Sequence, residues 1–348
     1  MKDNNELTVL GIESSCDETA AAVVRSDPRG QRMKLLSNAV ASQVSVHRLY
    51  GGVVPEIAGR AHIEAISGIV GEALSDAGLT QADLDAVAVT THPGLIGALL
   101  VGVNFAKAFA YSASLPLVPV NHIHAHVCAA FIEHPAPEPP FLCLVVSGGH
   151  TSLGVADSYS EIRWIGGTRD DAAGEAFDKV GRVLGMPYPA GAAMDAAASA
   201  GDARRDPRRP YVKIPSPALP GDGIEFSFSG LKSAALNAIN RMRMAGEEPD
   251  VELFASEFTN AIAEGIASKI PDAAAQSGCR TLVMSGGVAA NTHLRAAVAR
   301  VCAENGIQTI IPDRKYCTDN GAMVAAAGVF GFAAGNIAPL SLNASAED

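Results

Sequence analysis

Two short hydrophobic runs separated by a polar turn open the chain and predict a β-hairpin. Residues 7–12 are apolar, residues 13–19 (ESSCDET) are polar, and residues 20–24 are apolar again. The arrangement recurs about 134 residues later, where the apolar run 141–146 leads through SGGHTS into the apolar residues 153–155. Short apolar runs bounded by turn residues are typical of strands. The repetition indicates two similar halves.

Helical and strand patterns alternate along the rest of the chain. Strands that alternate with helices are typical of α/β proteins, so the pattern predicts an α/β fold. Gly306 is expected to end the predicted helix of residues 288–304. Helices are predicted over 57–77, 97–111 and 288–304, and strands over 85–90, 117–120 and 281–285.

A further helix is predicted after Thr168, which would cap it, with Asp171 three residues on as in a capping box. Residues 203–223 are rich in Pro, Arg and Gly, so they are expected to form a loop or the rim of an insertion. Residues 343–348 are expected to be disordered. The apolar stripe of the helix after Thr168 would consist of Ala173, Ala176, Phe177, Val180, Val183 and Leu184.

Composition places the chain among ordinary globular proteins. Its 348 residues suit one large domain or two medium ones, and 48% are hydrophobic against 18% charged. The six cysteines form no CxxC pair, which fits a reducing compartment rather than a disulfide framework. No signal peptide is recognised at the N-terminus, and the apolar stretches 95–103 and 322–334 are shorter than a membrane span. The expectation is a soluble, cytoplasmic protein without a membrane segment.

The net charge of −11 argues against broad electrostatic capture of nucleic acid, because phosphate contacts need Lys and Arg. The only dense basic cluster lies in residues 204–213, with Arg204, Arg205, Arg208, Arg209 and Lys213. Such a run can contact phosphates, or it can be a solvated loop.

Three histidines within five residues form the first candidate site. If a helix begins at His122, then His122 and His126 share one face, at the spacing of two imidazoles on one metal, and His124 points elsewhere. The alternative is a helix end with solvated or hydrogen-bonded histidines. Ile123 stands where the HExxH motif of zinc proteases has its general-base Glu, so that hydrolytic machinery is not predicted.

Two Gly-Gly turns follow predicted strands, in LVVSGGHT (144–151) and LVMSGGVAAN (282–291). Glycines let backbone N–H groups approach an anion closely, and the second turn opens a predicted helix, whose N-terminus favours anionic ligand groups. Asn291 would lie in the first turns of that helix, where it could bond a ribose or base. The alternative in both cases is an ordinary tight turn.

Two aspartates complete the set of candidates. Asp178 lies beside the predicted apolar stripe, and Asp is the usual partner of ribose hydroxyls, although a solvated carboxylate is the simpler interpretation. Asp319 precedes an apolar helix and is expected to be its N-cap; the alternative is a third metal ligand beside His122 and His126.

Together and in this order, these segments resemble the TsaD family of tRNA adenosine threonylcarbamoyltransferases. The resemblance runs from about residue 8 to 335. It is carried by GIESSCDET (11–19), YGGVVPEIAGRAH (50–62), PGLIGALLVG (93–102), HIHAH (122–126), LVVSGGHT (144–151), DDAAGEAFDKVGRVLG (170–185), FSFSGLK (226–232), MSGGVAAN (284–291) and CTDNGAM (317–323).

The resemblance implies a duplicated actin-like, ribonuclease-H-like α/β fold with a nucleotide cleft between two halves, here 1–130 and 131–335, followed by a tail, 336–348. The helix near 319–335 could pack back on the first half. The implied metal ligands are His122, His126 and Asp319, holding Fe(II) or Zn(II). The implied binding site for the adenylated substrate consists of Val145, Val146, Ser147, Gly148, Gly149, Asp178, Gly191, Asp195 and Asn291.

The implied reaction moves a threonylcarbamoyl group from threonylcarbamoyl-AMP to the exocyclic amine of adenosine 37, in tRNAs that read codons beginning with A. The implied partners are tRNA, a TsaB-like paralogue and a TsaE-like ATPase. Ala190, where many members have Gly, and the extra His124 depart from the family pattern.

Three other functions compete with this one. They are a metalloendopeptidase, an actin-superfamily kinase acting on small molecules, and a nucleotide-binding scaffold without catalysis. The missing Glu after His122 counts against the first. The turn Glu13-Ser14-Ser15, where such kinases usually have Asp-x-Gly, counts against the second.

Overall fold

The computed structural model describes residues 6–221 and 223–347. By internal contacts the chain divides into two units, each with one β-sheet. The first unit contains the described residues of 1–139, 156–162 and 312–348, and the second contains those of 140–155 and 163–311.

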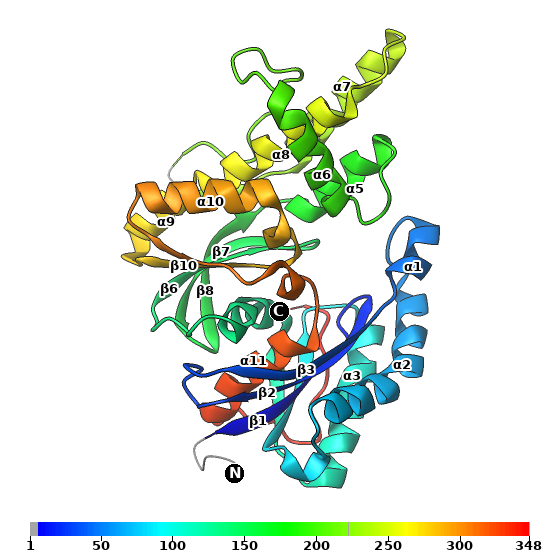
Figure 1. Ribbon diagram of the computed structural model, residues 1–348, viewed down its shortest axis with the longest axis vertical. Helices are drawn as coiled ribbons and strands as arrows, with labels where there is room; N and C mark the ends of the chain where they lie inside the picture. The colour runs from blue at the N-terminus through cyan, green and yellow to red at the C-terminus, as the bar shows by residue number, and fades with distance from the viewer. Residues whose placement is uncertain (1–5, 222, 348) are drawn as a thin grey trace. The chain divides into compact units, whose positions relative to one another are not determined.

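The sheet of the first unit has the strand order β3-β2-β1-β4-β5 (Figure 1). Strands β1 to β3 are antiparallel neighbours, whereas β4 runs parallel to both β1 and β5. The antiparallel part contains the predicted hairpin. The strands are β1 (Leu7–Glu13), β2 (Glu18–Ser26), β3 (Lys34–Ser42), β4 (Ala86–His92) and β5 (Leu117–Asn121).

Helices cover both faces of this sheet. Leu10 and Ile12 of β1 belong to one hydrophobic cluster with residues of α2 (Pro55–Asp76) and α3 (Ile96–Ala113). Gly11 lies between them and faces α11 (Gly321–Ala333), because a Cβ on Gly11 would lie 2.2 Å from the Ala325 nitrogen. Successive side chains of a strand point to opposite faces, so α2 and α3 cover one face and α11 the other.

The sheet of the second unit has the order β11-β10-β6-β7-β8-β9. Read from β8 to β11, it repeats the order of the first sheet, with β10 again parallel to both of its neighbours and β9 added at the edge. The predicted duplication is thus present. The strands are β6 (Phe141–Val146), β7 (Thr151–Ser158), β8 (Glu161–Thr168), β9 (Ile224–Phe226), β10 (Thr281–Ser285) and β11 (Gln308–Ile310).

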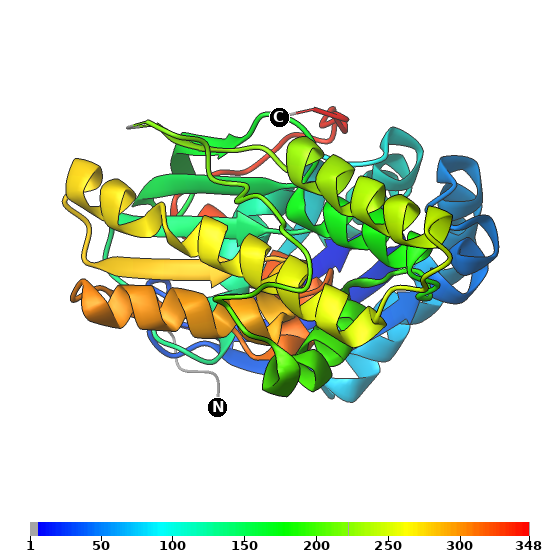
Figure 2. The ribbon, with the colours of Figure 1, turned by 90° about the horizontal axis from the view of Figure 1, so that it is seen from above.

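The second unit carries most of its helices in the long connections after β8 and β9 (Figure 2). Helix α8 packs closely against α6 and α10. The helices are α5 (Ala173–Val183), α6 (Gly191–Gly201), α7 (Ser229–Met244), α8 (Val251–Ala267), α9 (Ile270–Ser277) and α10 (Thr292–Glu304). Shorter helical segments elsewhere are α1 (Val44–His47), α4 (His122–Cys128), and the 3₁₀ turns Arg48–Tyr50, Gln81–Asp83, Ala129–Ile132, Asp202–Arg204, Gly287–Ala290 and Arg314–Tyr316.

The predicted capping box at Thr168 is wrong. Thr168 is the last residue of β8, and α5 begins only at Ala173, after Ala172, with no side-chain cap. The Asp171 carboxylate is held by Lys179 and Lys232 instead of by a backbone amide. Strand pairing of β8 with β9 therefore prevails over the local capping pattern.

The predicted disorder of the C-terminus is also wrong for the described residues 343–347. Ser345 donates its backbone N–H to the Thr91 carbonyl (2.9 Å), and Gly94 donates to the Ala346 carbonyl (3.3 Å). Leu342 packs against the core of the first unit, and its carbonyl accepts a hydrogen bond from Lys107. These contacts tie the segment to the end of β4 and to α3.

Helix α3, at 18 residues, is longer than the apolar stretch predicted there and is long and apolar enough to cross a membrane. This finding rests on length and composition only, and the buried core helices of soluble proteins meet the same two criteria. Here α3 packs against β4 and α2.

Candidate metal centre and nucleotide-binding turns

The three histidines of the HIHAH segment lie on a short helix, α4, which begins at His122 as predicted. Asn121 determines this start, because its side-chain oxygen accepts hydrogen bonds from the Ile123 and His124 backbone amides, at 2.8 and 3.1 Å. One helical turn separates His122 from His126, and their ring centres lie 4.6 Å apart.

Asp319 faces these two histidines and does not cap α11. The N-cap of α11 is Asn320, whose side chain accepts a hydrogen bond from the Met323 amide (2.9 Å), so the prediction of Asp319 as the cap is wrong. Asp319 Oδ1 lies 3.6 Å from His122 Nε2 and 3.3 Å from His126 Nε2. One ligand atom from each of the three residues lies within 4.8 Å of the others.

Glu13, at the end of β1, contacts Nδ1 of the His122 ring, whereas Asp319 faces Nε2. Glu13 is fully buried, and its Oε2 lies 3.1 Å from His122 Nδ1 and accepts a hydrogen bond from the Thr90 hydroxyl (2.7 Å). Burial raises the pKa of the Glu13 carboxyl, but its interaction with His122 outweighs this and holds the pKa below its usual value. A carboxylate only accepts, so Nδ1 carries the hydrogen, and Nε2 is the nitrogen that faces Asp319.

This arrangement fits a divalent metal. A carboxylate behind a ligating histidine fixes the tautomer and orientation that metal binding needs. Two imidazoles and one carboxylate suit Zn(II) or Fe(II) and leave coordination positions for a substrate. Within the described residues, His126 Nδ1 is buried without a hydrogen-bond partner, so Nε2 is its only nitrogen that meets another polar group.

Glu13 is not among the site residues predicted from the sequence, although it lies in the segment GIESSCDET. The local signal was a carboxylate at the end of a wholly apolar strand, where its side chain must be buried. Its partner His122 is 109 residues away in the sequence, and only the sheet brings the ends of β1 and β5 together.

A buried histidine of α2, His62, fixes the turn that follows Glu13. Its Nε2 lies 3.0 Å from the Cys16 carbonyl, which can only accept, so Nδ1 accepts from the Thr19 hydroxyl at 2.7 Å. On the same turn, the Ser15 hydroxyl lies 3.2 Å from His122 Nδ1. His62 therefore positions the groups that support His122.

Replacing His62 with Phe is expected to lower the affinity for the metal about tenfold. The reason is that the turn loses the hydrogen bonds of His62 with the Cys16 carbonyl and the Thr19 hydroxyl. Metal retained during dialysis against graded chelator measures the affinity. The control is Val70→Ala, which also changes a buried residue of α2 and lowers stability without touching the turn. Equal metal retention in His62→Phe and wild type would show that the turn needs no such support.

In the second unit, the turn after β6 contacts two other turns. A Cβ on Gly174, at the start of α5, would lie 2.7 Å from the Ser147 carbonyl oxygen, and Gly174 donates its N–H to that oxygen. Gly286, in the left-handed region at φ +93°, packs equally closely on the Val146 carbonyl. The structure thus brings the two Gly-Gly turns and the start of α5 together around Val145 to Gly149.

The glycines that a ligand would approach are not packed against the protein. A Cβ added to Gly148, Gly149, Gly191 or Gly287 would meet no atom within 4 Å, in contrast to Gly174 and Gly286. These positions thus leave room for a group to approach the backbone, and ligand binding there stays a prediction.

The predicted ribose-binding residues are partly engaged within the protein. Asp178 accepts the Ala190 amide on Oδ1 (2.7 Å), and no hydrogen bond to its Oδ2 is found among the described residues. Burial raises the pKa of Asp178. Asn291 does not lie inside the helix as predicted: it caps α10, accepting from the Leu294 amide at 2.9 Å. Asp195 accepts from the Thr292 amide and hydroxyl and lies 2.8 Å from His293 Nδ1.

His293 links Asp195 to Asp202, which lies 2.8 Å from its Nε2. The hydrogen bond with Asp195 raises the pKa of His293, with burial opposing and Asp202 adding to the rise. Burial raises the pKa of each aspartate, but their hydrogen bonds outweigh it and hold both values low. The protonated histidine therefore joins α6, α10 and the 3₁₀ turn at Asp202.

His293→Gln is expected to destabilise the protein by about 1.5–3 kcal/mol near pH 6, the usual worth of hydrogen bonds to charged groups. A raised pKa contributes stability below the unfolded value of about 6.5, and this is lost as pH rises through the folded value. The lowered pKa values of Asp195 and Asp202 require a pH above about 4. Urea unfolding at pH 6 and pH 9 measures the difference, which must shrink at pH 9; a difference that does not change with pH would contradict the charged state.

Comparison with solved structures defines the class of fold. Two HypF structures, one described as full-length in the phosphate- and nucleotide-bound form and the other from T. kodakarensis, superpose with TM-scores of 0.58 and 0.60 at 16% and 13% identity. They cover 100% and 97% of this chain, and 48% and 49% of those chains. Component A of (R)-2-hydroxyglutaryl-CoA dehydratase from Acidaminococcus fermentans superposes at 0.51 (15% identity, 94% and 99% covered). The chain thus has an α/β fold of the actin-like class, divided into two units.

Within that class, the chain belongs to the TsaD family. The family model, described as tRNA N6-adenosine threonylcarbamoyltransferase, matches residues 34–326. Relatives with that description include proteins from Syntrophomonas wolfei (49% identical, covering 97% of this chain and 96% of the relative) and Clostridium perfringens (46%, covering 98% and 97%). The predicted resemblance is confirmed, and the protein is a tRNA-modifying transferase.

Proposed function

We propose that this protein transfers the threonylcarbamoyl group from threonylcarbamoyl-AMP to the exocyclic amine of adenosine 37, in tRNAs that read codons beginning with A, and releases AMP. The observation that carries the proposal is the group His122, His126 and Asp319, supported by Glu13, in a chain of the TsaD family.

The reaction needs no nucleophile from the protein. The amine nitrogen attacks the carbamoyl carbon, the bond from that carbon to the phosphate oxygen breaks, and AMP leaves with the electron pair while the amine loses a proton. Catalysis then consists of holding the reactants in place and stabilising the charge that develops on the oxygens.

His122, His126 and Asp319 would hold one divalent metal, with Fe(II) favoured and Zn(II) as the alternative. When bound, the metal supplies Lewis-acid stabilisation of substrate oxygens. The protein's own part is to orient the ligands. Glu13 holds the proton on His122 Nδ1, and His62 fixes the turn between Glu13 and β2.

The turns of the second unit would bind the adenylate. The open backbone at Gly148, Gly149 and Gly191 admits the phosphate and the nucleoside, and Asp178 Oδ2 is available to a ribose hydroxyl. Val145 and Val146 end the buried strand that supports the turn, and Ser147 closes it, through bonds of its amide and hydroxyl with His150. Asn291 and Asp195 would act indirectly, because their hydrogen bonds fix the start of α10.

We also propose a TsaB-like paralogue and a TsaE-like ATPase as partners, in the cytoplasm. An apolar hollow on α2 and α3 would suit a protein partner such as the paralogue, because exposed apolar surface favours association with another protein. The hollow is lined by Ile63, Ile66, Leu100, Val101, Asn104 and Phe105, and the Ile63 side chain at its edge is 66% exposed.

Depletion of the protein from its cell tests the proposed function. Nucleoside analysis of total tRNA is expected to show loss of threonylcarbamoyladenosine and its return when the wild-type chain is supplied. Failure of Asp319→Ala to restore the nucleoside would link the effect to the candidate metal centre. Unchanged threonylcarbamoyladenosine after depletion would contradict the proposal.

A further inference from the structure

The basic loop of residues 204–213 is not uniform, because two of its five cations are already neutralised. Arg204 makes a forked pair with Asp250, at 2.6 and 3.1 Å, and reaches Glu252 at 2.7 Å. Arg205 pairs at 2.9 Å with Glu257, which is 5% exposed. These two arginines hold the loop against α8, and the acidic side chains there neutralise their charge.

The segment that follows is a fixed turn. Asp206 accepts the amides of both Arg208 and Arg209, at 2.9 Å each, through its side chain and its carbonyl. Pro207 and Pro210 restrict the backbone on either side. Beyond the turn, Tyr211 donates its amide to Glu257 (3.2 Å). The turn is therefore bonded to α8 on both sides.

The cations that this turn displays have no acidic partner. Arg208, Arg209 and Lys213 are exposed, and no ion pair of their side chains is found within residues 6–221 and 223–347. Neighbouring acids are already occupied, since Arg204 holds Asp250 and His293 with Ser256 holds Asp202. On a chain of net charge −11, this turn carries three cations beside the one carboxylate of Asp206 and is a local excess of positive charge.

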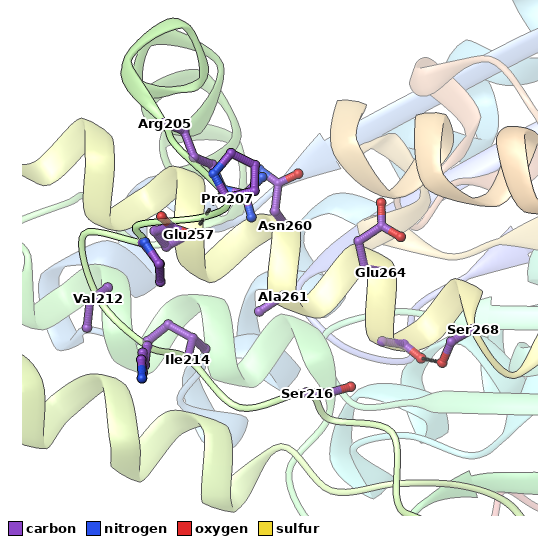
Figure 3. A pocket seen from close by; sticks show the side chains of 13 residues that line it. Arg205, Pro207, Val212, Ile214, Ser216, Glu257, Asn260, Ala261, Glu264 and Ser268 are labelled. Atoms are coloured by element: carbon purple, nitrogen blue, oxygen red, sulfur yellow. Dashed lines mark hydrogen bonds and ion pairs between the residues drawn. The ribbon is translucent and has the colours of Figure 1, made fainter.

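A cavity of about 600 Å³ lies between this loop and α8 (Figure 3). Its acidic side chains, Glu257 and Glu264, are paired with Arg205 and Arg300. Lys213 also lines the cavity, whereas Arg208 and Arg209 are not among its lining residues. In Figure 3, Arg205 and Pro207 lie on the loop at the edge of the cavity. Arg208 and Arg209 thus suit a ligand that passes over the surface.

We propose that Arg208 and Arg209, with Lys213, contact the phosphate backbone of the substrate tRNA. The inference rests on the proposed function for the identity of the polyanion. A fixed turn that presents two arginines loses little conformational freedom on binding, and the guanidinium fork matches phosphate oxygens. The contact carries no sequence information and sets the position of the tRNA on the second unit.

The test compares tRNA binding by the full chain at 50 to 300 mM salt in wild type and in Arg208→Ser, Arg209→Ser. Both changed side chains are exposed and unpaired, so the fold should be kept. We expect affinity at about 100 mM salt to fall by on the order of tenfold or more, and the slope of log K against log salt to shrink by about 2. Lysine at both positions should restore most of the slope.

Arg29→Ser, Lys34→Ser is the matched control, because it removes the same charge from exposed positions of the first unit. A slope that shrinks equally in the control would show a general charge effect and overturn the inference, as would an unchanged slope in the Arg208, Arg209 variant. The proposed function is tested separately by transfer in the wild type. If the wild type binds tRNA through these arginines but transfers nothing, the proposed function is contradicted and the proposed tRNA contact is retained.

Discussion

Asp319→Ala and His126→Ala are each expected to strip the metal from the purified protein and to reduce threonylcarbamoyl transfer by about 10²–10³-fold. A metal that stabilises charge in the transition state is worth several kcal/mol, and each 1.36 kcal/mol is tenfold in rate. Two remaining ligands cannot hold a divalent ion tightly in the site. Elemental analysis of the metal per chain, with the transfer rate measured on the same preparation, checks both parts.

His124→Ala is the matched control for this prediction. His124 lies on the same helix between the two candidate ligands, but it is not part of the group that the structure brings together. It should keep the metal and the activity. Full metal occupancy in the double variant His126→Ala, Asp319→Ala would show that the ion binds elsewhere, and the assignment of the centre would fail.

Gly149→Val is expected to abolish adenylate binding while the protein stays folded. A Cβ at Gly149 meets no protein atom within 4 Å, so the substitution costs the empty fold little. A phosphate that lies against the backbone of this turn would collide with the new side chain. Calorimetry with a non-reactive adenylate, together with thermal unfolding, separates the two effects, and we expect at least about a 100-fold loss of affinity, or about 2.7 kcal/mol.

Gly230→Val is the control, because its Cβ also meets no atom within 4 Å but lies at the start of α7, outside the Gly-Gly turns. It should bind the adenylate as the wild type does. Unchanged affinity in Gly149→Val would remove the turn after β6 from the binding site.

Local patterns predicted the features that depend on near neighbours. The two hairpins follow from apolar runs on either side of polar turns, and α4 begins at His122 because the preceding Asn121 caps it. The two Gly-Gly turns also follow from the sequence, although Gly286 packs against the Val146 carbonyl whereas Gly148 and Gly149 have no atom near an added Cβ.

Features that depend on distant partners could not be predicted in this way. Asp319 and Asn320 are equally good caps on paper, and only the fold shows that Asn320 bonds the Met323 amide while Asp319 meets two histidines from α4. Thr168 has the spacing of a cap but pairs within the sheet.

Which cations of the basic loop are paired with acids could not be predicted for the same reason. Arg204 and Arg209 look alike in the sequence. Only in the structure does Arg204 pair with Asp250 and Glu252, at the start of α8, 46 and 48 residues away. Asp195 likewise resembles a ligand-binding residue, and its three bonds to Thr292 and His293 become visible only when α6 and α10 are placed.

The central claim is that this chain itself performs the transfer. The most direct measurement mixes the purified, metal-loaded protein, with and without its proposed partners, with threonylcarbamoyl-AMP labelled in the threonyl group and an unmodified tRNA that reads a codon beginning with A. We expect labelled threonylcarbamoyladenosine at position 37 and one AMP released for each group transferred, with loss of both in Asp319→Ala. AMP release without labelled tRNA in every mixture would contradict this claim.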